Sequence, residues 1–216
     1  MTAKPTRAPT AGPACASGSR GGSMMALPTL SASVVNGDPQ AVPHVATVAT
    51  TLCRGCRAPL GGYAFGVSGK DQPADCALCW LARHLERPRI DDEARLIWLP
   101  GMSQAALNVT VRVIHLRRRA ASLGVRHEDV EDGHLHFAEA GLAAYAEAAR
   151  ARVGSDKPSD LCRALLRLPP DVYHRRGTLL SGLRLLPLGR FFDGEDDIYP
   201  EILDGWRAAH SCVRAA

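Results

Sequence analysis

The hydrophobic residues of the chain change their spacing at about residue 48. Before this point Ala, Pro, Thr, Gly and Ser dominate, and apolar positions recur with neither a strand nor a helix period. Such a composition is typical of segments that bury too little apolar surface to fold. We expect a disordered, low-complexity leader over residues 1–48 and a single folded domain over residues 49–212.

Three stretches have the pattern of β-strands. Residues 63–67 alternate apolar and small positions between glycines, which predicts one strand of a small hairpin. Residues 95–100 form a compact apolar run closed by a proline, and residues 183–192 are typical of one strand or two paired strands. Short strands among longer helical segments favour an α+β fold.

Helical periodicity recurs in the other segments. The best-defined helix follows Ser103, a natural N-cap, and ends in three arginines. One face of this helix carries Leu107, Val111, Ile114 and Arg118. Further helices are expected over residues 80–86, 135–152 (with Leu142 and Tyr145 facing inward), 159–168 and 199–206.

Length, composition and charge exclude several classes of protein. The chain has 216 residues, 46% of them hydrophobic, a formal net charge of +4 and a pI of about 8.8. This mild excess of basic residues permits a nucleic acid or an acidic protein as a partner without requiring one. No long apolar run is present, and Pro and Gly interrupt the basic N-terminus, so we expect neither a transmembrane helix nor a signal peptide. These features predict a cytoplasmic protein.

The candidate chemistry is concentrated in two Cys-x-x-Cys pairs, Cys53 with Cys56 and Cys76 with Cys79, separated by nineteen residues. This spacing is typical of one tetrahedral Zn²⁺ held by four thiolates. Four sulfurs leave no coordination position for water or a substrate, so we interpret the zinc as structural. Gly55 suits the first turn, because a backbone amide there must approach a sulfur closely.

Two alternatives to a zinc site are a pair of disulfides and buried thiols without a metal. Disulfides need an oxidising compartment, and matched Cys-x-x-Cys pairs rarely arise by chance. Cys15, Cys162 and Cys212 make the total odd, and we expect Cys162 and Cys212 to be small core residues. His84, five residues beyond Cys79, is the alternative fourth ligand, but four cysteines already complete the site.

A search for an active site predicts no catalytic residues. Nucleases of the HNH type also carry paired Cys-x-x-Cys turns, but they need a general-base histidine in the hairpin and further ligands for a catalytic metal. Residues 57–75 contain no histidine. Asn108 and His115 lie seven residues apart on one predicted helix, without an evident site around them. Phosphate-binding, nucleophile-elbow and metalloprotease motifs are absent from the sequence.

Three clusters of charged or titratable residues have structural interpretations. Residues 117–119 are arginines that close a helix, and we expect them to be solvated, with a polyanion or acidic partner as the alternative. His134 and His136 enter a helix, where their side chains diverge, so we expect them on the surface. An acidic turn without the ligand spacing of an EF-hand is formed by Asp193, Glu195, Asp196 and Asp197.

Segments that follow the cysteine pairs in order carry a family resemblance. They are Leu-Ile-Trp-Leu-Pro at 96–100, Met-Ser-Gln-Ala-Ala-Leu-Asn at 102–108, Leu-Leu-Pro-Leu-Gly-Arg at 185–190 and Tyr-Pro-Glu-Ile-Leu-Asp-Gly-Trp at 199–206. With them, the chain resembles the IcmJ/DotN family of type IVB (Dot/Icm) secretion systems, whose counterpart in conjugative plasmids is TraT. The resemblance covers about residues 50–210, and Gly101 interrupts the family pattern Pro-Glu-x-Ser-Gln.

The resemblance implies a fold and a place in an assembly. It implies an accessory subunit of the type IV coupling complex, which lies at the cytoplasmic face of the inner membrane around a coupling ATPase. It also implies an HNH-like ββα zinc module over about residues 50–90, helices over 100–212, and no evident nuclease centre. The zinc ligands carry over to Cys53, Cys56, Cys76 and Cys79.

The expected function is therefore that of a zinc-stabilised adaptor. It binds the coupling ATPase, reaches the membrane only through its partners and is not an enzyme. The alternative is an HNH-like zinc-dependent nucleic-acid-binding protein or nuclease. Salt separates the two, because binding to nucleic acid weakens steeply with salt concentration and an apolar protein contact does not.

Overall fold

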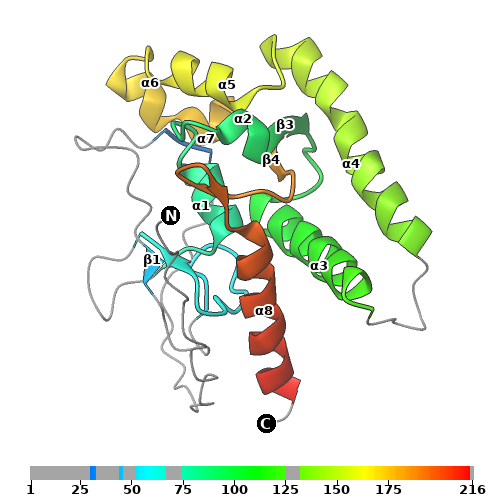
Figure 1. The fold of residues 1–216 in the computed structure, drawn as a ribbon. Coiled ribbons are helices and arrows are strands. Elements are labelled where there is room, and N and C mark those ends of the chain that lie inside the picture. Colours follow the sequence, from blue (N-terminus) through cyan, green and yellow to red (C-terminus); the bar gives the residue numbers. More distant parts are fainter. Residues whose placement is uncertain (1–29, 33–43, 46–51, 67–73, 125–131, 215–216) are drawn as a thin grey trace, which may run out of the picture.

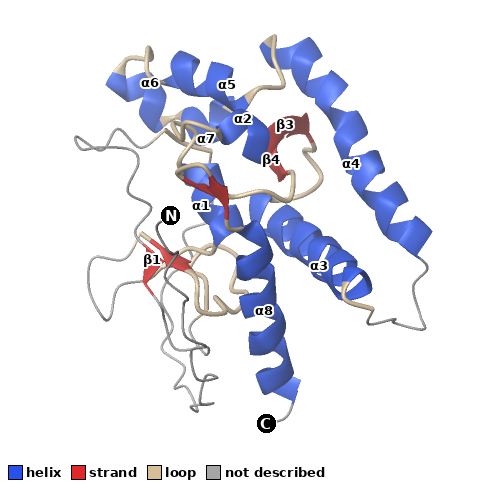
Figure 2. Ribbon diagram, in the orientation of Figure 1, coloured by secondary structure: helices blue, strands red, loops and turns tan. Residues whose placement is uncertain are grey.

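A computed structural model describes residues 30–32, 44–45, 52–66, 74–124 and 132–214. Within these residues the helices are α1 (Ala77–Arg83), α2 (Ile90–Glu93), α3 (Gln104–Ser122), α4 (Asp132–Val153), α5 (Pro158–Leu165), α6 (Pro170–His174), α7 (Arg176–Leu179) and α8 (Tyr199–Arg214). The strands are β1 (His44–Val45), β2 (Ala64–Phe65), β3 (Ala94–Trp98), β4 (Leu183–Pro187), β5 (Phe192–Asp193) and β6 (Asp196–Asp197). They pair antiparallel as β1–β2, β3–β4 and β5–β6. This mixture of helices and small sheets fits the predicted α+β class (Figures 1 and 2).

The β3–β4 ladder lies at the centre of the packed helices. It joins segments almost ninety residues apart, with Leu96 opposite Leu185, and both side chains are fully buried. Helix α4 lies along β3, and α3 packs against β4, α4 and α8 (Figure 1). Most side chains of both strands are buried, including adjacent ones, which shows that the ladder is covered on both of its faces.

Helix α3 confirms the predicted N-cap. The Ser103 hydroxyl accepts a hydrogen bond from the backbone N–H of Ala106 at 3.1 Å, which satisfies one of the free amides at the helix start. The predicted apolar residues Leu107, Val111 and Ile114 are buried. Arg118, predicted on the same face, is instead half exposed and forms an ion pair with Glu139.

In helix α4, one of the two side chains predicted to face inward is exposed instead. Leu142 packs partly buried against the core as predicted, but the prediction that Tyr145 faces inward is wrong, because its side chain is 46% exposed. The buried face of this helix is made by Ala146 and Ala149. Alanines let the helix axis come close to β3, and a close approach leaves no room for a tyrosine ring. The side chains of His134 and His136 lie outside the described residues.

The predicted leader and the first hairpin are described only in part. Residues 1–48 lie outside the described residues except for 30–32 and 44–45. The amide of Ser31 donates to the carbonyl of Ala82 in α1, and the carbonyl of Ser31 accepts from the amide of Leu85, just after that helix. The strand predicted at 63–67 is confirmed as the shorter β2, which pairs with β1. Within the described part of the chain, no helix combines the length and hydrophobicity needed to cross a membrane.

Helix α8 packs against the turn after the first cysteine pair through two glycines. Gly61 has a φ of +65°, and a methyl group built on Gly205 would lie 2.2 Å from the carbonyl oxygen of Gly61. Trp206, the next residue of α8, is fully buried. The two backbones therefore touch at a point where only glycine fits.

Alanine substitutions at two helical glycines should have opposite effects. Gly205→Ala should lower the free energy of unfolding by about 1–3 kcal/mol, because its methyl group would overlap the backbone of Gly61. Gly141→Ala in α4 should raise it by about 0.5–1 kcal/mol, because open space surrounds that position and alanine favours helix. Urea unfolding of both variants measures the difference. Equal stabilisation by both alanines would contradict the close approach of α8.

Candidate metal centre

The four cysteines of the two pairs lie together, as the sequence predicts. We call Cys53, Cys56, Cys76 and Cys79 the cysteine cluster; their sulfur atoms all lie within 4.8 Å of one another. The first pair occupies a turn before β2, and the second pair opens α1, where Cys76 is the N-cap residue. Three of the side chains are fully buried, and that of Cys56 is half-buried.

The spacing of the sulfurs fits a tetrahedral metal ion. The Sγ atoms of Cys56 and Cys76 are 3.7 Å apart. Metal–sulfur bonds of about 2.3 Å at tetrahedral angles put two sulfurs roughly 3.8 Å apart. A disulfide would need about 2.05 Å, and all four residues are free thiols here. The cluster could therefore hold one ion, and the alternative of two disulfides does not describe its geometry.

Backbone and side-chain N–H groups point at the sulfurs. The amides of Gly55 and Cys76 donate to Sγ of Cys53 at 3.3 and 3.2 Å. The Nδ2 group of Asn108 in α3 donates to Sγ of Cys79 at 3.3 Å. A methyl group at Gly55 would lie 2.9 Å from that same sulfur, which confirms the predicted need for glycine. Such donors stabilise thiolate over thiol, as a metal ligand requires.

The turn that carries the first pair closes through its own backbone. The amide of Cys53 donates to the carbonyl of Ala58 at 2.8 Å, and the amide of Arg57 donates to the carbonyl of Cys53 at 2.9 Å. Arg57 has a φ of +62°, a left-handed conformation that an L-residue adopts at some cost. The turn directs both sulfurs of the pair to one side.

Hydrogen bonds among the four thiols give them different pKa values. The bond from Cys56 holds the pKa of the Cys53 thiol far below its usual value, and the bond with Cys53 holds the pKa of Cys76 well above it. The sulfurs thus share protons within one buried group. A metal ion that binds all four as thiolates must release the remaining protons, so its affinity falls as the pH is lowered.

Asp75 fastens the first turn to α1 beside the cluster. Its buried carboxylate accepts from Nε and Nη2 of Arg54 at 3.0 and 2.8 Å, and Nε of Arg83 in α1 lies 3.1 Å away. Burial raises the pKa of Asp75, and the hydrogen bonds from Arg54 oppose that shift. The carboxylate thus joins Arg54, in the turn of the first cysteine pair, to Arg83 of α1, the helix that begins at the second pair.

The histidine alternatives do not join the cluster. The imidazole of His84 stacks on Trp80 with ring centroids 3.5 Å apart, and its Nδ1 lies 2.8 Å from Oε1 of Glu86. His115 is buried, and its Nδ1 lies 2.7 Å from the hydroxyl of Tyr199. Seven residues along α3 separate His115 from Asn108 by about 10 Å, so the structure assembles no joint site from them.

Two clusters of charged residues form ion pairs and hydrogen bonds with other parts of the fold. Of the three arginines at 117–119, Arg118 pairs with Glu139 and Arg119 with Asp204, at 2.7 Å in the second case. In the acidic turn, the carboxylate of Asp197 accepts from the backbone amides of Phe191 and Tyr199 at 3.0 and 3.1 Å. The other acidic side chains of this turn reach the solvent wholly or in part. These contacts fit the prediction of a solvated structural turn.

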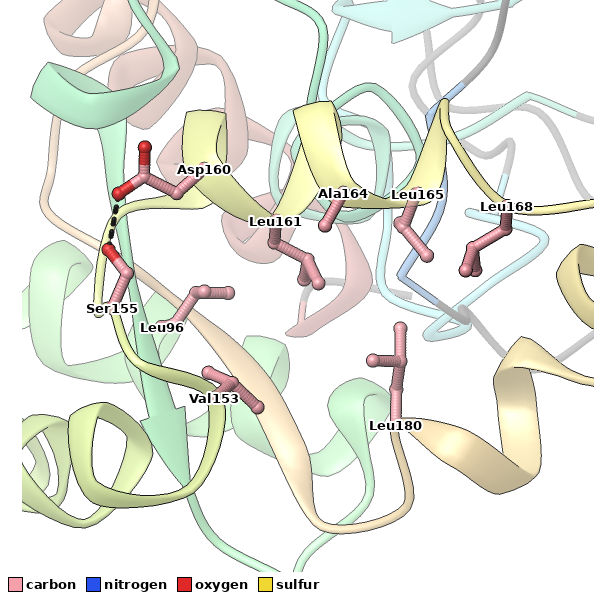
Figure 3. A pocket seen from close by; sticks show the side chains of 9 residues that line it. All are labelled: Leu96, Val153, Ser155, Asp160, Leu161, Ala164, Leu165, Leu168 and Leu180. Atoms are coloured by element: carbon pink, nitrogen blue, oxygen red, sulfur yellow. Dashed lines mark hydrogen bonds between the residues drawn. The ribbon is translucent and has the colours of Figure 1, made fainter.

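A cavity of about 250 Å³ lies away from the cluster, between α5 and the end of α4 (Figure 3). Leu161 and Leu165 point into it from α5, opposite Val153 and Leu180. Its polar end is a hydrogen bond of 2.5 Å between the Ser155 hydroxyl and the Asp160 carboxylate. The helix predicted over residues 159–168 is confirmed as the slightly shorter α5, and its apolar side chains line this cavity as well as the core. The predicted core residue Cys162 is buried in the same helix.

Asn108 should tune the metal affinity of the cluster. Asn108→Leu removes the donor to Cys79 and should weaken zinc binding about 10-fold, within the range seen for residues that support metal ligands. Competition with a chromophoric chelator measures the affinity. Val111→Ala on the same helix is the control: it should lower stability and leave zinc affinity unchanged, because Val111 is buried but its side chain has no hydrogen-bond donor for a sulfur.

No protein-family model matches the chain, and no curated protein is similar to it in sequence.

Proposed function

We propose that the cysteine cluster holds one structural zinc ion and that the protein is an adaptor, a binding protein and not an enzyme. The observation that carries this proposal is the closed cluster: four buried or half-buried sulfurs with N–H donors directed at them. The zinc would supply folding free energy to a module whose own core is small. No further group of three or more metal-ligating side chains is found in the described part of the chain.

We further propose that the chain is an IcmJ/DotN-like subunit of a type IV coupling complex. The segments that carry the resemblance meet around the cluster, which supports reading them as one unit. Gln104 donates to the carbonyl of Leu185 and to Asn108, and Asn108 donates to Cys79. From the last segment, Gly205 packs on the turn at Gly61.

The finer fold proposed for this module is an HNH-like ββα unit. Two features support it: β1 and β2 pair antiparallel, and α1 follows them with the second cysteine pair at its start. The nuclease chemistry of such units needs a general-base histidine and further metal ligands. The described hairpin strands contain one histidine, His44 of β1, and no cluster of ligands other than the cysteines.

The partner proposed is the coupling ATPase at the cytoplasmic face of the inner membrane, with membrane association only through that partner. The zinc and the β3–β4 core would give the adaptor a rigid surface on which a segment of the ATPase can dock. Rigid presentation lowers the entropy cost of binding.

Three measurements on one preparation test the proposal. We expect one zinc per chain after purification without added metal, retention of the coupling ATPase in a pull-down, and no DNA cleavage in Mg²⁺ or Mn²⁺. Binding to the ATPase should persist when salt rises from 50 to about 200 mM, a change that weakens nucleic-acid binding by orders of magnitude. Cleavage above a Cys79→Ser control, lost again in His44→Ala, would establish the nuclease alternative instead.

A further inference from the structure

Arg112 is a buried cation without a hydrogen-bond partner. It lies in α3, its side chain is 2% exposed, and none of its three guanidinium nitrogens has a partner among the described residues. The guanidinium lies over the ring of Trp206 in α8, 4.1 Å from the ring centroid. This cation–π contact attracts the charge but satisfies none of its N–H donors.

An unpaired guanidinium in the core is costly, and proteins nearly always compensate such a charge. Arg87, also buried among the described residues, shows the ordinary solution, because it bonds to Glu93 and to the carbonyl of Phe192. Neither an acidic side chain nor a carbonyl plays this part for Arg112 among the described residues. Its compensation must come from another group nearby.

The helix face that carries Arg112 points at the cysteine cluster. Asn108, one turn earlier on α3, donates to the sulfur of Cys79. Burial lowers the pKa of Arg112, and negative charge on Cys76 and Cys56 opposes that shift, which places these sulfurs within electrostatic range. A divalent ion with four thiolates carries a net charge of −2.

We propose that Arg112 is the counter-ion of a dianionic metal–tetrathiolate centre, held in place by Trp206. This inference rests on the proposed zinc site. The negative charge of the metal centre stabilises the buried guanidinium, and the guanidinium stabilises the fourth thiolate. The two opposite charges therefore compensate each other. Trp206 covers the guanidinium from the α8 side, and the charge of the metal centre is thereby linked to the docking of α8.

The test is the dependence of metal affinity on charge, measured by chelator competition with Zn²⁺ and by the thiolate-to-metal absorption of Co²⁺. Arg112→Met, similar in length and uncharged, should weaken both metals by about 10- to 100-fold. Arg112→Lys keeps the charge and should stay within about threefold of the parent protein, well below the loss expected for Arg112→Met.

A ligand variant separates charge from packing. In Cys56→His, a neutral imidazole replaces one thiolate and the centre carries −1. If Arg112 acts as a counter-ion, adding Arg112→Met to this variant should weaken binding by only about 3- to 10-fold, the square root of the 10- to 100-fold effect in the parent, because the Coulomb energy is proportional to the charge of the centre. Arg87→Met is the matched control, because it removes a buried but paired arginine and should lower stability without a specific loss of metal affinity.

The outcomes distinguish the inference from the function on which it rests. A parent protein that binds neither Zn²⁺ nor Co²⁺ would overturn both. A parent that binds one ion per chain, with unchanged affinity in Arg112→Met, would overturn the counter-ion and leave the zinc site. The counter-ion would also be overturned if Arg112→Met caused the same loss of affinity in the parent, with four thiolates, and in Cys56→His, with three. Such a result would show that Arg112 acts through packing and not through its charge.

Discussion

Cys79→Ser should abolish metal binding and unfold the module from residue 52 to the end of α1. The sulfur of Cys79 is fully buried and belongs to the ligand set, so its loss removes metal-binding free energy on the order of 10 kcal/mol. Cys53→Ser should have the same effect. Metal analysis and thermal unfolding followed by circular dichroism measure the result, and the proposed binding to the coupling ATPase should be lost with the module.

Cys162→Ser provides the matched control. This thiol is also buried, in α5, but it lies outside the cysteine cluster. The serine should cost about 1–3 kcal/mol as a buried hydroxyl and should leave the metal content unchanged. A Cys79→Ser protein that stayed folded with one zinc per chain would show that the ligands were wrongly assigned.

Glu93→Gln should lower the free energy of unfolding by about 3–5 kcal/mol, the largest effect expected away from the metal. Both side chains of the Arg87–Glu93 pair are almost fully buried, with two hydrogen bonds of 2.8 and 2.5 Å between them. The Glu93 carboxylate also accepts from the amide of Phe192 at 2.7 Å. Glutamine keeps the shape and leaves the charge of Arg87 uncompensated.

The neighbouring ion pair of Arg89 with Asp92 is the control for Glu93→Gln, because solvent exposure should make its contribution to stability small. Asp92 pairs with Arg89 at 3.0 Å, but the two side chains are 53% and 33% exposed. Asp92→Asn should therefore cost less than about 1 kcal/mol. Urea unfolding compares the two variants. Similar losses at Asp92 and Glu93 would contradict the burial of the Arg87–Glu93 pair.

Local signals in the sequence account for much of the fold. The hydroxyl of Ser103, the 3.6-residue spacing of Leu107, Val111 and Ile114, and the cysteine spacing each act over a few residues. Such short-range chemistry predicts helix starts and buried faces well, and the structure confirms both and brings the four cysteines together. The short helices α2, α6 and α7 escaped prediction, because four or five residues are too few for a periodic pattern.

Long-range contacts could not be predicted from one sequence. The pairing of Leu96 with Leu185 depends on how intervening helices fold back, and neither strand carries a signal for its partner. The roles of Asn108 and Arg112 were missed for the same reason. A signal was present, since both lie at the helical spacing of buried positions on α3, where a polar side chain needs a partner.

The contact between Gly61 and Gly205 has a consequence for synthesis of the chain. The four cysteines emerge from the ribosome early, whereas Gly205 of α8, which packs on their turn, is made about 125 residues after Cys79. At about 5–20 residues per second, this delay lasts roughly 6 to 25 s. The nascent thiols are therefore exposed to the cellular metal supply before the last helix closes over their turn, so the proposed zinc could bind before the site is buried.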